Sequence, residues 1–141
     1  MAITLSTTFT DNLLGTGTQG VATQFGGGTL ILYASGGSPP PGPNEATTGT
    51  LLATFNFSAT GSQGTPAAGA MTLVFAATTV TATGGSGSTA DYFRINTSGA
   101  VALIQGSVGT SGADWNLSSV SITAGDSITI TGTPSISWVV S

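Results

Sequence analysis

The sequence predicts a single-domain, all-β protein of the β-sandwich or jelly-roll type. Apolar residues alternate with polar ones along most of the chain, which is the period of a half-buried strand. The composition agrees, because 26 Thr residues favour strands, whereas Glu, Lys and Arg are scarce. A length of 141 residues suits one domain with a core of its own. We therefore treat residues 1–141 as one β-sandwich domain.

The N-terminal part, residues 1–28, is expected to hold one strand followed by a Gly- and Thr-rich segment. Ile3, Leu5 and Phe9 alternate with hydroxyl residues, and one helical turn is expected at residues 11–14. The G-x-G-x-x-G pattern of residues 15–20 matches the dinucleotide fingerprint, which needs a helix directly after it. Residues 21–28 contain too much Gly and too few helix formers for that helix, so we interpret the pattern as a loop.

The remaining strands are short and separated by glycine-rich joints. Tight hairpin turns are expected at Ser98-Gly99 and at residues 124–126, and a flexible loop at residues 84–88. With the first strand, the pattern gives nine or ten strands in all. The later ones are expected at residues 29–33, 50–58, 71–75, 78–83, 90–96, 101–108, 120–122, 127–131 and 135–140.

A proline-rich arm at residues 35–49 interrupts this series. Pro39, Pro40, Pro41 and Pro43 exclude helix or strand interior, so we expect an extended, polyproline-like path. A structureless segment of this length inside a compact domain is usually functional or disordered. The arm is therefore the best local candidate for a contact element.

The charge balance excludes several function classes. The chain has no His and no Cys, Arg94 is its only Lys or Arg residue, and its net charge is −4. This composition excludes Ser-His-Asp and Cys-His catalysis, a zinc site of the usual ligands and a P-loop. A single cation cannot neutralise several phosphates, so we expect no nucleic-acid binding. We also expect no secretory signal and no membrane span.

The remaining candidate residues favour contacts over chemistry. The carboxylates are scattered, and turn or capping roles suit Asp114 and Asp126, so we expect no enzyme, no metal site and no cofactor. Alternation places Tyr92 and Arg94 on one face of a strand; Arg94 either binds a carboxylate ligand or pairs with an Asp of this chain or of a neighbouring subunit. Trp115 follows a turn and is interpreted as an exposed anchor.

One segment carries a family resemblance. Residues 106–117, GSVGTSGADWNL, followed by VSITAG at 120–125, resemble a recurring pattern in small virion structural proteins of tailed bacteriophages. Residues 29–33, 49–54 and 92–94 match the same layout in order. The resemblance implies a capsid decoration, or cement, protein on the outer surface of the phage head, made in the bacterial cytoplasm. Its implied partners are the major capsid protein and further copies of itself, most simply as a homotrimer.

Two alternatives stay open at this point. One is a carbohydrate- or receptor-binding module on the tail, which needs two or more exposed aromatic residues on one surface; the other is a neck or tail structural ring. For any of these roles, the candidate interface residues are Pro39, Pro40, Pro41, Pro43, Tyr92, Arg94 and Trp115.

Overall fold

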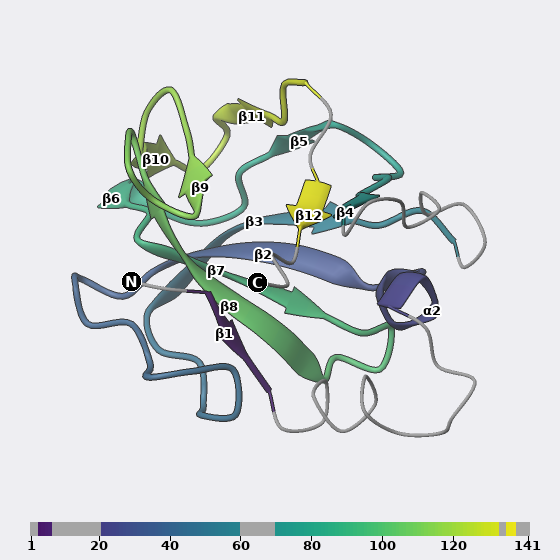
Figure 1. Cartoon of the computed structure of the whole chain (residues 1–141). Helices are drawn as coiled ribbons and strands as arrows, with labels where there is room; N and C mark the ends of the chain where they lie inside the picture. The colour runs from purple at the N-terminus through teal and green to yellow at the C-terminus, as the bar shows by residue number, and fades with distance from the viewer. Residues whose placement is uncertain (1–2, 7–20, 60–69, 133–134, 138–141) are drawn as a thin grey trace.

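The computed structural model describes residues 3–6, 21–59, 70–132 and 135–137. These residues form a nearly all-β protein with one curled main sheet and three small sheets, which confirms the predicted β-sandwich-like fold. In Figure 1, the small sheets lie along the upper side of the main sheet, and the loop between β2 and β3 hangs below it.

The main sheet has the strand order β1-β8-β7-β2-β3, and β9 pairs in parallel with the far end of β8. All its other pairs are antiparallel. Its centre sets two antiparallel pairs, β2–β3 and β7–β8, side by side, so that β2 lies between β3 and β7. The strands are β1 (Thr4–Leu5), β2 (Thr29–Ala34), β3 (Thr50–Asn56), β7 (Tyr92–Asn96), β8 (Ala102–Gly109) and β9 (Trp115–Asn116).

The three small sheets are antiparallel pairs that form the second layer. They join β5 to β11, β6 to β10 and β4 to β12. Backbone hydrogen bonds from Thr83 to Leu52 and from Ala76 to Asn56 attach this layer to β3. The strands are β4 (Ala70–Thr72), β5 (Thr79–Thr81), β6 (Ser86–Thr89), β10 (Ser121–Thr123), β11 (Ser127–Thr129) and β12 (Ser135–Ser137).

Two predictions about this layer are wrong in detail. The expected flexible loop at residues 84–88 contains most of β6, because β10 supplies a pairing partner that is distant in the sequence. Residues 124–126 do form a tight turn, but β10 and β11 on either side of it pair with β6 and β5 and not with each other. By contrast, Ser98-Gly99 does lie in the turn between β7 and β8, where Thr97 N donates to Val101 O.

The core lies between the two layers. Leu52, Phe55 and Phe93 from the main sheet share one apolar cluster with Ile122 and Ile128 from the second layer. Their spacing follows the predicted alternation, since Ile122 and Ile128 are each flanked by exposed Ser and Thr residues. Burial of these side chains, at about 25 cal/mol per Å² of apolar surface, drives the packing of the layers.

A short helix, α2 (Val21–Phe25), corrects the expectation that residues 21–28 hold no helix. Its last residue, Phe25, is fully buried and stacks on Phe57 with ring centroids 5.8 Å apart, so tertiary packing overrides the weak local propensity. The expected helical turn at residues 11–14 and the glycine pattern at 15–20 lie outside the described residues. So does Phe9.

Candidate functional site

The clearest built feature of the molecule is a loop held against one face of the main sheet. Residues 35–49, here called the proline-rich loop, connect β2 to β3, and Ala34 pairs with Thr50 where the loop begins and ends. The loop has no strand or helix, as predicted, but it folds back onto the sheet instead of extending away. Its adjacent ends and compact path are those of an Ω-loop.

Arg94 on β7 binds the middle of this loop. Its Nη1 and Nη2 atoms donate to the carbonyl oxygens of Glu45 and Gly42 at 2.8 and 2.9 Å, and its Nε donates to Gln105 Oε1 at 2.8 Å. The side chain is only 3% exposed. A rigid guanidinium fork can serve three acceptors in different directions, whereas a Lys ammonium cannot match this geometry.

Gln105 extends this clamp from the neighbouring strand. It lies directly opposite Arg94 in the β7–β8 pair and is completely buried. Its Nε2 donates to the carbonyl oxygen of Pro40, so both ends of its amide are used. Since each partner is oriented by the other, the pair fixes the loop backbone at residues 40, 42 and 45.

Two stacked tyrosines lie beside the clamp. The rings of Tyr33 on β2 and Tyr92 on β7 are 4.9 Å apart and nearly parallel. The Tyr92 hydroxyl donates to Thr48 O at 2.7 Å and accepts from Thr48 N at 3.2 Å. Burial raises the pKa of both phenols above the ordinary value, so both remain neutral over the usual pH range.

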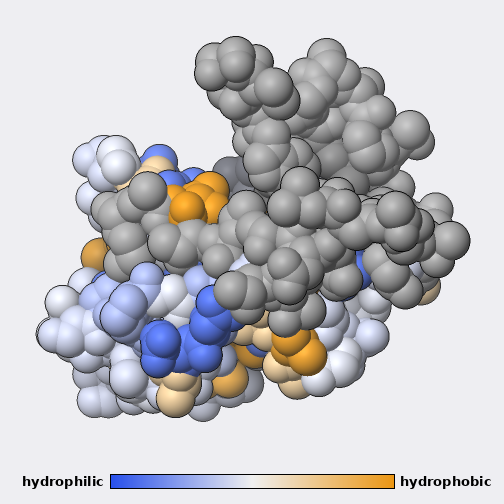
Figure 2. Space-filling view, turned by 60° about the horizontal axis from the view of Figure 1, so that its bottom comes forward, coloured by the Kyte–Doolittle hydropathy of each residue, from blue (hydrophilic) through white to orange (hydrophobic). Residues whose placement is uncertain are grey.

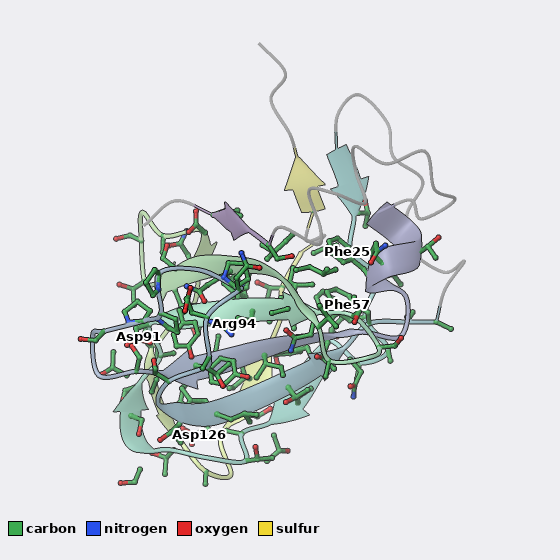
Figure 3. All side chains as sticks on the ribbon, turned by 90° about the horizontal axis from the view of Figure 1, so that it is seen from below. Phe25, Phe57, Asp91, Arg94 and Asp126 are labelled. Carbon is green, nitrogen blue, oxygen red and sulfur yellow. The ribbon has the colours of Figure 1, made fainter. Side chains whose placement is uncertain are left out.

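Asp91 holds the start of the loop. Its carboxylate oxygens accept hydrogen bonds from Ser35 N, Ser35 Oγ and Gly37 N at 2.7–3.1 Å; Ser35 N reaches both oxygens. Figure 3 shows Asp91 at the side of the molecule opposite Phe25, Phe57 and α2, with Arg94 between them. Loop residues from 35 to 48 are therefore bound to β7 and β8 along most of their length.

Most of the predicted interface residues in the loop and beneath it are partly or fully buried. Pro41 is exposed and Pro39 is half-buried, whereas Pro40 and Pro43 are buried against the sheet. Tyr92 and Arg94 share a face, as predicted, but that face is covered by the loop, so both side chains are buried and offer no outer surface. The expected carboxylate partner of Arg94 is also wrong: the acceptors are carbonyl and amide oxygens, because the loop backbone lies within reach.

Trp115 lies elsewhere and is not the exposed anchor that we expected. Its ring lies nearly perpendicular to the rings of Phe55 and Phe93, with both centroid distances at 5.8 Å, and the side chain is half-buried, so part of the indole belongs to the core. The rest lines an open groove of about 610 Å³, here called the Trp115 groove. Its lining residues are 115–119, 121–122 and 126–131.

The outer surface of the described residues carries carboxylates and no exposed cation. Glu45, Asp114 and Asp126 are exposed, whereas Arg94 is buried. Asp114 and Asp126 cap the backbone, as predicted: Asp114 accepts from Ser107 N and Asp126 from Thr123 N, each at 2.8 Å. On the face shown in Figure 2, apolar atoms form small separate spots among paler, more polar ones.

Sequence reasoning missed the roles of Gln105 and Asp91. A usable signal existed for Gln105, since a hairpin turn at Ser98-Gly99 places it near Arg94 on the next strand. No comparable signal pointed to Asp91, because its partners, Ser35 and Gly37, are more than 50 residues away.

Within residues 3–6, 21–59, 70–132 and 135–137, no cluster of three or more metal-ligating side chains occurs, and no helix is long and apolar enough to cross a membrane. Comparisons with protein-family models, with curated proteins and with solved structures found no match to this chain.

Proposed function

We propose that this chain is a non-enzymatic structural protein of a bacteriophage particle, and that it decorates the outside of the head by bridging capsid subunits. The resemblance of residues 106–117 to small virion structural proteins suggests this class. The proline-rich loop is the structural observation that supports a contact role, because a partner can bind an already ordered loop without first paying its ordering entropy.

The surface chemistry supports attachment without ion pairs. The exposed part of the loop is largely neutral, with Glu45 as its one charged side chain. A decoration contact would therefore depend on shape, apolar contacts and backbone hydrogen bonds, including strand addition at sheet edges. A stable contact of this kind buries on the order of 1,200–2,000 Å².

Binding to phage heads that lack this protein tests the proposal. Expanded heads are mixed with the purified chain, and occupancy is measured by gel densitometry after sedimentation. We expect saturable binding that changes little between about 50 and about 500 mM NaCl, because screening acts on exposed charge pairs. A tenfold loss of occupancy over that range, or no binding at all, would contradict the proposal.

A pair of charge-matched variants tests the role of the loop. Pro41→Glu adds a carboxylate to the exposed part of the loop, and Ser111→Glu adds the same charge to an exposed turn after β8. We expect Pro41→Glu to reduce head occupancy and Ser111→Glu to leave it unchanged. Equal occupancy of the two variants would remove the loop from the contact.

Copy number separates head decoration from a neck or tail ring. Densitometry of purified virions should give hundreds of copies for decoration and about a dozen or fewer for a ring. Sedimentation of the free protein tests the proposed homotrimer.

A further inference from the structure

The Trp115 groove has a different chemistry from the proline-rich loop and involves other elements. Its volume of about 610 Å³ lies in the range of small-ligand sites. Trp115 and Leu117, both half-buried, contribute to its apolar part together with three buried Ile residues, and the ends of β10 and β11 supply hydroxyl-bearing side chains. Such a groove combines a flat aromatic surface with many neutral hydrogen-bonding groups.

Several of these polar groups are available to a ligand. In the part of the chain that the structure describes, the hydroxyls of Ser118, Ser127 and Thr131 make no hydrogen bond. Asp126 uses one carboxylate oxygen, Oδ2, to accept from Thr123 N. Each free hydroxyl can both donate and accept, which suits a ligand that itself carries hydroxyls.

The charge of the groove favours a neutral ligand over an anionic one. Asp126 is the one ionisable side chain among its lining residues, and no cation lies among them. An anionic ligand would therefore meet a carboxylate and no compensating charge, whereas a neutral polyol meets matching donors and acceptors.

We infer that the Trp115 groove is a binding site for a short neutral oligosaccharide. The partly positive C–H face of a pyranose ring would rest on the accessible part of the Trp115 indole, whose π face is negative. Among the described residues, Trp115 is the one aromatic residue that lines the groove, so this is a single sugar site and not a tail module with two or more exposed aromatic residues on one surface. Its hydroxyls would bond to Ser118, Ser127, Thr131 and Asp126. The groove and the proline-rich loop share no residue, so this inference is independent of the proposed attachment to a particle.

The test uses three neutral probes, cellotriose, maltotriose and chitotriose, with the acidic trisaccharide sialyllactose as a comparison. Each is titrated into the ¹⁵N-labelled full chain while amide and indole N–H shifts are recorded. We expect at least one neutral probe to shift the Trp115 indole and the Ser127 amide with a Kd of about 1 mM or tighter. Sialyllactose should bind more weakly.

Isosteric variants locate the site. Thr131→Val removes a groove hydroxyl and should weaken binding by about threefold to tenfold, the effect of one hydrogen bond. Thr47→Val is the control, since Thr47 is also exposed but lies in the proline-rich loop, outside the groove. Trp115→Phe keeps an aromatic ring against Phe55 and Phe93 and should also weaken binding.

Three results would overturn the inference. The first is that no neutral probe shifts the groove residues. The second is that sialyllactose binds more tightly than every neutral probe. The third is that Thr47→Val weakens binding as much as Thr131→Val does. Because Thr131 and Thr47 are both exposed, neither variant depends on a disruptive change in the core.

Discussion

Arg94 and Gln105 face each other across the β7–β8 pair, and the 2.8 Å hydrogen bond between them joins the chain's only side-chain cation to a fully buried amide. Together they bind three carbonyl oxygens of the proline-rich loop. The cation thus has an internal structural role, and the loop owes its path to two side chains on the sheet.

Arg94→Met should lower the free energy of unfolding by about 2 kcal/mol, because it removes the charge-assisted hydrogen bonds that a buried guanidinium makes to the loop and to Gln105 Oε1. Urea unfolding followed by circular dichroism measures the loss. Hydrogen exchange should become faster at Thr48 and Gly37, whose amides are protected only while the loop is docked. Unchanged exchange at both amides would show that Arg94 does not hold the loop.

Tyr92→Phe should cost about 1 kcal/mol of stability, since the Tyr92 hydroxyl both donates to and accepts from Thr48. Tyr33→Phe is the matched control, because Tyr33 is the other half of the stack and its hydroxyl makes no hydrogen bond among the described residues. We expect its effect to stay within about 0.5 kcal/mol. Equal losses of the free energy of unfolding in the two variants, measured in urea, would show that the Tyr92 hydroxyl contributes no more to stability than the Tyr33 hydroxyl does.

Alkaline pH should destabilise the protein through the same two residues. Burial raises the folded-state pKa of Tyr33 and Tyr92, so the folded state retains protons that the unfolded state releases. Their stabilisation is fully present below the unfolded pKa of about 10 and is lost as pH rises through the folded values. The chain has no other tyrosine, so the tyrosinate absorbance that develops near 295 nm as pH rises comes from this pair. Native protein should titrate at higher pH than protein in urea, and coincident curves would contradict the prediction.

Gly49→Ala should be strongly destabilising. Gly49 has a φ of +84°, and an added Cβ would overlap the carbonyl oxygen of Ala34 at the closing point of the loop. Gly36→Ala is the control, because Gly36 has a φ of +74° with open space around it. We expect about 1 kcal/mol for Gly36→Ala, from backbone conformation alone, and a clearly larger loss for Gly49→Ala. Similar melting temperatures for the two variants would show that the overlap is relieved at no cost.

Local patterns predicted most of the strands and failed where pairing partners are distant in the sequence. Alternation at residues 92–95 correctly placed Tyr92 and Arg94 opposite Phe93 and Ile95, because period two is a property of the strand itself. The strand β6 was missed because Ser86–Thr89 has little apolar character and is ordered by β10. Helix α2 was missed because the burial of Phe25, and not local propensity, stabilises it.

The candidate site was predicted in part for the same reason. The prolines marked the loop as a special segment, since their restriction of the backbone is local. The loop folds back onto Tyr92 and Arg94, and Trp115 packs on Phe55. Both contacts depend on tertiary neighbours that a short stretch of sequence does not contain. We therefore expected Tyr92 and Arg94 at an interface, although the structure buries both side chains.

The pairing of Ala34 with Thr50 also makes the molecule a natural carrier for foreign peptides. A graft between Ala46 and Thr47, both exposed, would begin and end at a fixed base, so the strands would keep their register. Each doubling of the inserted length adds only about 0.6 kcal/mol of closure entropy. The position between Ala46 and Thr47 is therefore suited to displaying an epitope, because the paired residues Ala34 and Thr50 hold the two ends of the loop together.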